Sequence, residues 1–144
     1  MKKSVFVMVA GFLPVAAHAD PADITCRFLA VMGSNQAEQV EPMLKDIAPR
    51  FEGERLESAT NTLRSIAAGA PFAGGSAWTV LSLGEDLEEH LVLFRLKEGE
   101  LAGSLLRYEW SPEGLALTNI EFHRQFADYV PDFTPTAPTA IDCS

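Results

Sequence analysis

The chain has 144 residues, of which 20 are acidic and 11 are Lys or Arg, so its formal net charge is −9 at neutral pH. A protein this acidic lacks the cations that neutralise a phosphate backbone, which excludes a role in general nucleic-acid binding. A basic protein or an uncharged ligand is a better electrostatic match. Because 47% of the residues are hydrophobic and the length suits one domain, the composition predicts a single globular unit rather than disorder.

The first segment, Met1 to Ala19, has the pattern of a removable secretory signal peptide. Lys2 and Lys3 make its start positive, residues 5–17 form an apolar stretch, and the small residues Ala17 and Ala19 precede the expected cleavage position. The apolar stretch falls short of the about 20 residues that a membrane-spanning helix needs. We therefore expect an exported protein, periplasmic or secreted, that begins at Asp20 and has no stable membrane insertion after cleavage.

The only two cysteines, Cys26 and Cys143, lie near opposite ends of the expected mature chain. Thiols oxidise in exported proteins, and neither a CxxC spacing nor a neighbouring histidine favours a redox or metal-binding pair. We therefore predict one structural disulfide, which should stabilise the fold by on the order of 5 kcal/mol. It would tie a Pro/Thr-rich tail, residues 127–144, back to a single α+β domain over residues 20–126.

Three helices are expected in the first half of the mature chain. The first runs from Asp20 to Gly33 and opens with an acidic N-cap and a proline. The second opens at Glu41 and ends before Pro49, and Gly69 ends the third. Apolar residues recur at helical spacing in all three: Ile24, Phe28, Val31 and Met32, then Met43, Leu44 and Ile47, then Leu56, Ala59, Leu63, Ile66 and Ala67.

After the third helix the apolar pattern alternates, which predicts strands. Residues 71–75 are expected to form the connecting loop because they combine Pro and Gly. The four expected strands cover residues 77–83, 89–96, 100–110 and 115–125. Turns that end in Gly99 and Gly114 should join the last three into an antiparallel meander. The predicted fold is therefore α+β, with N-terminal helices packed on a curved four-stranded antiparallel sheet.

These two turns also predict the register of the meander. Leu96 should oppose Glu100, and Ser111 should oppose Leu115. One sheet face is then expected to be buried under the helices: His90, Val92, Phe94, Leu96, Ala102, Leu106, Tyr108, Trp110, Ala116, Thr118, Ile120 and Phe122. The opposite face carries charged residues and also Leu91, Leu93, Leu105 and Leu117. These leucines need a cover, for which the tail and a second copy in a homodimer are both candidates.

This order of elements, three helices followed by a twisted antiparallel meander between Asp20 and Gln125, resembles the cystatin-like superfold. Within that superfold it resembles the nuclear-transport-factor-2-like proteins, which include ketosteroid isomerase. The resemblance implies a cone of sheet and helices around an apolar pocket. Some members perform acid–base chemistry there with an Asp, a Tyr or a His, whereas others bind a ligand or assemble. The resemblance therefore implies a pocket without choosing a function.

His90 is the strongest single candidate for chemistry, because the register places it on the buried face near Tyr108. An imidazole in an apolar pocket can act as a general acid or base. A core histidine satisfied by a hydrogen bond is the favoured interpretation, since no other catalytic group accompanies it. The expected ligand-binding set, for which plain core packing is the favoured alternative, comprises Trp78, His90, Phe94, Tyr108 and Trp110.

A second polar group is expected on the opposite sheet face. Glu121 and His123 point the same way from one strand, and Arg107 lies on the neighbouring strand. A solvated charge ladder is favoured over an acid–base or anion site. No spacing in the sequence predicts a metal site or a cofactor.

We therefore expect an exported, non-enzymatic binding domain that holds a small apolar ligand or a protein partner on its concave sheet face. Two alternatives stay open. One is a pocket isomerase or hydrolase that uses His90 with Tyr108 or a nearby carboxylate. The other is an acidic inhibitor of a cationic exported enzyme, for which the negative charge would speed association.

Overall fold

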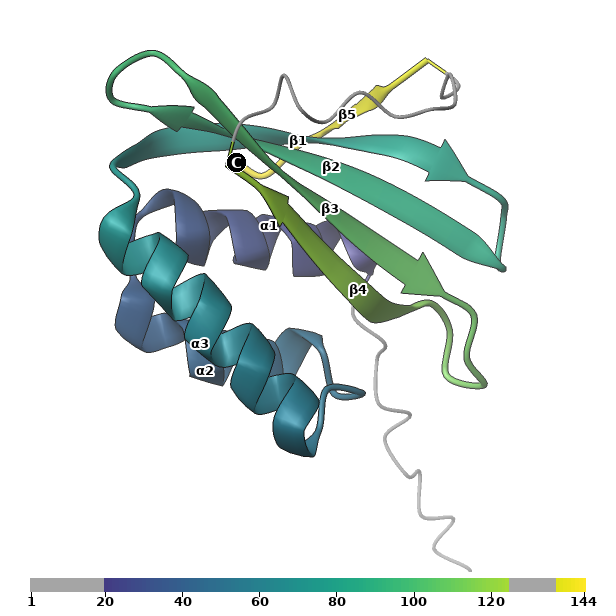
Figure 1. The fold of residues 1–144 in the computed structure, drawn as a ribbon. Coiled ribbons are helices and arrows are strands. Elements are labelled where there is room, and N and C mark those ends of the chain that lie inside the picture. The colour runs from purple at the N-terminus through teal and green to yellow at the C-terminus, as the bar shows by residue number, and fades with distance from the viewer. Residues whose placement is uncertain (1–19, 125–136) are drawn as a thin grey trace, which may run out of the picture.

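The computed structural model describes residues 20–124 and 137–144. The predicted signal peptide lies outside the described residues. In chain order the elements are α1 (Pro21–Gly33), the short 3-10 helix η1 (Ala37–Gln39), α2 (Val40–Ile47), α3 (Gly53–Gly69), β1 (Phe72–Ser82), β2 (Leu87–Leu96), β3 (Leu101–Glu109), β4 (Ala116–His123) and β5 (Thr139–Ile141). The helices pack against one face of an antiparallel sheet, which confirms the α+β class (Figure 1).

The three predicted helices are confirmed to within a few residues. Asp20 caps α1, where its carboxylate accepts a hydrogen bond from the backbone N–H of Ala22 at 2.9 Å. α2 begins at Val40, and α3 ends at Gly69 as expected. The apolar stripes face inward, and their most deeply buried members are Phe28, Met32, Val40, Met43, Leu44, Ile47, Leu63 and Ala67.

Within residues 20–124 and 137–144, the sheet has five strands in the order β4-β3-β2-β1-β5, one more than predicted. The predicted meander of β2, β3 and β4 is confirmed, and β1 pairs with β2. The additional strand, β5, pairs with β1 at Ala77–Thr79 and comes from the C-terminal tail. The sequence could not indicate it, because three residues directly after Pro138 show no alternation and depend on a tertiary partner.

The loop predicted over residues 71–75 is wrong, because β1 already begins at Phe72. Its glycines permit a close approach of the backbone rather than a turn. A Cβ atom on Gly75 would lie 2.4 Å from the Leu93 carbonyl oxygen and 2.8 Å from the Leu29 side chain. Only glycine fits between β2 and α1 at this position, and a bulge between Phe72 and Gly75 accompanies it.

The register predicted for the first hairpin is confirmed. The Leu96 N–H donates to the Glu100 carbonyl at 2.8 Å, and Gly99 has a left-handed φ of 91°. In the second hairpin the prediction fails near the turn, where Tyr108 pairs with Leu117 instead of Thr118. A bulge restores the predicted register at Arg107.

This bulge changes which residues reach the core. Leu117, predicted on the outer face, is fully buried beside Tyr108. Trp110, predicted on the buried face, is 58% exposed, because β3 ends at Glu109 and Trp110 already belongs to the following turn. The remaining core of the sheet is as expected and includes Val92, Phe94, Ala102 and Leu106.

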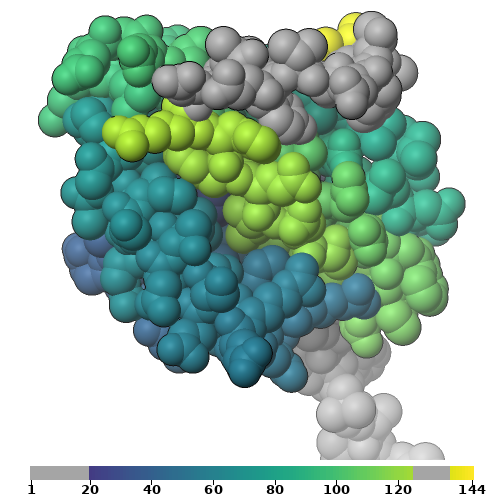
Figure 2. Space-filling model, in the orientation of Figure 1, coloured from purple at the N-terminus to yellow at the C-terminus, as the bar shows by residue number. Residues whose placement is uncertain are grey.

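The helices cover the sheet unevenly. α1 packs against β1 and β2, whereas α3 packs mainly against α2 and η1. The side of the sheet that ends in β4 is therefore covered less closely than the region of β1 and β2. In Figure 2, the yellow-green atoms of β4 and the teal atoms of α3 border a recess on the surface.

Candidate functional site

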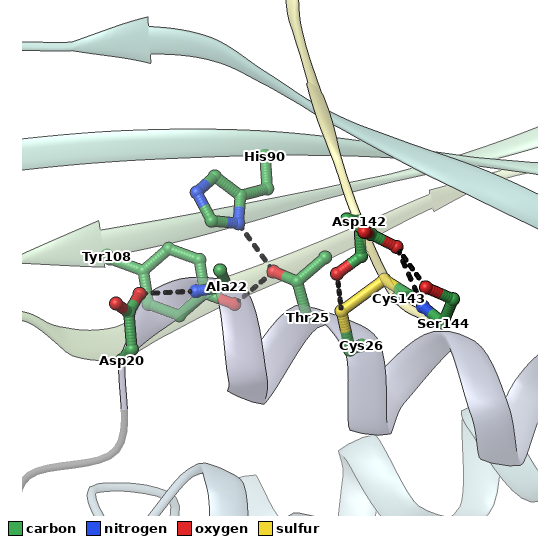
Figure 3. Close-up of a disulfide and its surroundings, with 9 residues drawn as sticks. All are labelled: Asp20, Ala22, Thr25, Cys26, His90, Tyr108, Asp142, Cys143 and Ser144. Atoms are coloured by element: carbon green, nitrogen blue, oxygen red, sulfur yellow. Dashed lines mark hydrogen bonds between the residues drawn. A yellow bond between two sulfur atoms is a disulfide. The ribbon is translucent and has the colours of Figure 1, made fainter.

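His90 lies at the centre of a buried polar network between α1 and the sheet (Figure 3). Its Nδ1 atom is 2.6 Å from the Thr25 hydroxyl oxygen, which is in turn 2.6 Å from the Tyr108 hydroxyl oxygen. On the other side of the ring, Nε2 contacts the Glu88 carboxylate. The network therefore joins one residue of α1 to two residues of β2 and one of β3.

One arrangement of protons satisfies every polar atom of this network. With the proton on Nε2, the His90 ring donates to the Glu88 carboxylate, and Nδ1 is free to accept. The Thr25 hydroxyl then donates to Nδ1 and accepts a hydrogen bond from Tyr108. Such complete pairing matches the favoured interpretation of His90 as a satisfied core histidine.

The order carboxylate, imidazole, hydroxyl is also that of nucleophilic catalysis, so burial must decide between the two interpretations. Thr25, His90 and Tyr108 each have 0% exposure. Only Glu88 reaches solvent, with 21% of its side chain exposed. A substrate could not contact the hydroxyl in this conformation, so the geometry serves to fix α1 on the sheet.

The Tyr108 hydroxyl supplies a test of this burial. Burial raises the pKa of Tyr108 far above its ordinary value, because the ionised phenolate would be desolvated. Below about pH 10 the tyrosine is neutral in both the folded and the unfolded chain. Above that pH only the unfolded chain releases the proton, so this group lowers the free energy of unfolding by up to about 1.4 kcal/mol per pH unit.

We expect the stability of the Tyr108→Phe variant to fall less steeply than that of the wild type above about pH 10. Urea unfolding at a series of pH values measures both slopes. The difference between the two proteins cancels the contribution of every other titrating group. Equal slopes for the two proteins would show that Tyr108 ionises in the folded state.

The other predicted ligand-binding residues are not gathered at one place. Phe94 is fully buried and stacks on Phe72 with ring centroids 4.8 Å apart. Trp78 pairs with Leu91 and therefore lies on the sheet face opposite His90. Trp110 is exposed beyond the end of β3. The structure thus brings together only His90 and Tyr108 of the expected set, whereas Phe94 is buried in the core among other phenylalanine rings.

The residues predicted as one polar group on the outer sheet face, Arg107, Glu121 and His123, make two separate sets of contacts. Arg107 makes two contacts to the Glu89 carboxylate, at 2.8 and 2.7 Å. This bond raises the pKa of the Arg107 guanidinium, to which the charge of Glu121 also contributes. Glu121 instead lies 3.8 Å from His123 and accepts a hydrogen bond from Asn119 at 2.9 Å. Apart from the Glu89 carboxylate, which is buried, the group is a half-exposed charge ladder across neighbouring strands.

Three hollows follow β4 from one end to the other. The first, of about 560 Å³, lies between the start of β4 and the end of α2. The second, of about 400 Å³, lies between β4 and α3, and its lining includes Leu63, Ile66, Ile120 and Phe122. The third, of about 730 Å³, lies at the end of α3 and shares Ile66 and Phe122 with the second.

The second and third hollows adjoin at Ile66 and Phe122, and we call the two together the α3–β4 groove. Its floor is apolar, because Ile66, Ile120 and Phe122 pack against the core from its edge. Arg55 crosses the groove near one end and donates to the Thr118 carbonyl. The same guanidinium lies 4.3 Å above the Phe51 ring centroid. None of the three hollows is lined by Thr25, His90 or Tyr108.

Sequence reasoning missed two members of the buried network and the groove itself. Thr25 is a polar residue beside Ile24 on the buried stripe of α1, and this position could have predicted a buried hydrogen bond. Glu88 stands two residues before His90, so strand alternation places both side chains on one face. The groove gave no signal in the sequence, because it depends on how far α3 stands from β4.

No group of three His, Cys, Asp or Glu residues that could hold a metal ion occurs in residues 20–124 and 137–144. Across the same ranges, no helix is long and apolar enough to cross a membrane. The two cysteines form the predicted disulfide, with Cα atoms 5.2 Å apart. The chain matches no protein-family model, no curated protein and no solved structure.

Proposed function

We propose that this protein is an exported, non-enzymatic binding domain that holds apolar groups of its ligand in the α3–β4 groove. The observation that carries the proposal is the groove itself, two adjoining hollows of about 400 and 730 Å³ with Ile66, Ile120 and Phe122 on their floor. Binding sites of this kind are concave and mostly apolar, with a few polar groups at the rim. Arg55 and Arg124 supply such groups at the rim.

The same geometry argues against a site deeper on the concave face. His90, Phe94 and Tyr108 are fully buried, so the helices and the aromatic core already occupy the space over the centre of the sheet. Among the described residues, the hollows open along β4, and the two that are lined by α3 have the apolar floor. The Cys26–Cys143 disulfide supports export, because such bonds persist in oxidising compartments.

A neutral apolar fluorophore, N-phenyl-1-naphthylamine, tests the proposal by fluorescence titration. We expect saturable binding to the folded protein. The Ile66→Glu variant should bind at least about tenfold more weakly, because it places a charge on the apolar floor that both hollows share. Ile66 is only partly buried at the edge of the core, so the new carboxylate can reach solvent and the variant is expected to fold.

Leu83→Ala is the matched control, because Leu83 is an exposed apolar residue that lines neither hollow. Its affinity for the fluorophore should equal that of the wild type. Failure of the wild type to bind, or equal binding by Ile66→Glu, would overturn the proposal. Urea unfolding of each variant verifies that the compared proteins are folded.

A further inference from the structure

β4 forms one edge of the sheet. In the part of the chain that the structure describes, β3 pairs with one side of β4, and no strand pairs with the other side. At an edge strand the outward N–H and C=O groups are free to pair with the backbone of another chain. The opposite edge of the meander is protected, because β1 and then β5 follow β2.

The Thr118 carbonyl shows what the β4 edge can accept. This carbonyl takes a hydrogen bond from the Arg55 side chain, which reaches across from α3. In a sheet, that bond would come from the backbone N–H of a neighbouring strand. Arg55 is exposed at the surface of α3, so an incoming strand could replace its guanidinium without opening the core.

The hollows lie where the side chains of such a strand would point. Ile120 and Phe122 are two residues apart on β4, so their side chains lie on the same face of the sheet, and both line the α3–β4 groove. A strand laid beside β4 alternates in the same way, so every second side chain would enter the space between β4 and α3. The three apolar residues in that space, Ile66, Ile120 and Phe122, favour apolar side chains at those alternate positions.

The charges around β4 indicate the sign of the partner. Glu98 and Glu100 line the groove at one end together with Arg124. Asp46 and Glu113 line the hollow at the other end together with Arg50. Arg27 pairs with Asp46 at 2.6 Å, so the two uncompensated acids lie at the end that Glu98 and Glu100 line, in a chain whose net charge is −9. This favours a segment with basic residues beside its apolar positions.

We propose that the partner is an extended, basic peptide segment of another protein that adds as a further strand along the edge of β4. Its backbone pairs with β4, and its alternate apolar side chains fill the α3–β4 groove. The inference rests on the proposed function, since it names the ligand of the same groove. Strand addition of this kind obtains affinity from main-chain hydrogen bonds and specificity from alternate pockets.

Selection from a random ten-residue peptide library on the immobilised, disulfide-bonded protein provides the probe. We expect the selected peptides to alternate apolar and polar residues and to carry net positive charge. The best peptide is then compared, by isothermal titration, with two copies that are N-methylated at the backbone of alternate residues, one copy for each of the two possible patterns. Each copy keeps all side chains but cannot donate backbone hydrogen bonds from one of its two edges.

Of the two possible N-methylation patterns, we expect the one that blocks the hydrogen-bonding side to abolish binding and the other to retain it. Binding that survives both patterns, or a library that yields no alternating basic binder, would overturn the inference. If the fluorophore still binds in the groove, the proposed function stands alone. If the fluorophore fails as well, both are lost.

Arg55→Met gives an independent check on the edge. Without the guanidinium the Thr118 carbonyl is free before the peptide arrives, so affinity for the selected peptide should rise about threefold to tenfold. Arg64→Met is the control, because it removes the same positive charge from α3. The Arg64 side chain contacts Glu41 and does not reach the Thr118 carbonyl. Unchanged or weaker binding by Arg55→Met, relative to Arg64→Met, would show that an incoming strand does not displace Arg55.

Discussion

A variant in which serine replaces both Cys26 and Cys143 should lose about 4 to 5 kcal/mol of its free energy of unfolding. The disulfide closes a loop with a sequence separation of 117, which covers nearly the whole described domain. Its removal allows the unfolded chain to occupy far more conformations, while few folded contacts change because both cysteines reach the surface. Against a typical total of about 5 to 15 kcal/mol, this loss is decisive.

Urea unfolding under non-reducing conditions measures the effect. The urea dependence of the free energy should also become steeper, because an unfolded chain without the cross-link exposes more surface. Wild-type protein reduced with a dithiol, and the single variant Cys26→Ser, should both match the double variant. A loss below about 1 kcal/mol would mean that the unfolded chain is constrained by something other than this bond.

Part of that loss should be local to β5. The strand has only three residues and pairs with β1 at Ala77–Thr79. Cys143 follows it directly and bonds to Cys26 on α1, so the disulfide holds the end of the chain where β5 can pair (Figure 3). This dependence on a covalent tether explains why the sequence predicted the disulfide but not the strand it supports.

The elements that the sequence predicted well are those fixed by local chemistry. Asp20 and Pro21 define the start of α1, and Gly99 fixes a hairpin whose register follows from the turn alone. In each case the deciding interactions lie within a few residues of one another. The burial of His90 followed from that hairpin register and is confirmed.

The features that the sequence did not predict depend on contacts between distant segments. Gly75 looks like a loop residue, yet it is required by the approach of Leu93 and Leu29 from two other elements. The bulge beside Thr118 reverses the expected direction of Leu117, although the Gly114 turn is of the expected kind. Such a one-residue change moves a side chain from one sheet face to the other.

The candidate site also combines features that local sequence predicts with features that depend on distant segments. Alternation along β2 and β3 placed His90 and Tyr108 on the same face, and their rings lie 4.9 Å apart. The hydroxyl that joins them comes from Thr25, which is 65 residues from His90 in the sequence. The α3–β4 groove is set by the position of a whole helix, and no local pattern encodes that position.

Phe94→Ala should have the second large effect, a loss of about 3 to 5 kcal/mol in the free energy of unfolding. The Phe94 side chain is fully buried and meets three other rings: Phe28, Phe72 and Phe122. Truncation leaves a cavity that these rings cannot fill, since they are held by the helices and by neighbouring strands. Phe94→Leu, which leaves a smaller cavity, should lose less stability.

The same variant separates a core role for Phe94 from the ligand-binding role that the sequence suggested. A residue that lines an open site has little packing to lose, so its truncation would weaken ligand binding and leave the unfolding midpoint nearly unchanged. A core residue gives the opposite result. Because Phe94 lies beneath Phe72 and Phe122, which border the groove, we expect a large fall in the urea midpoint. A stable Phe94→Ala protein that no longer binds the fluorophore would instead place the ligand deeper in the sheet than the α3–β4 groove.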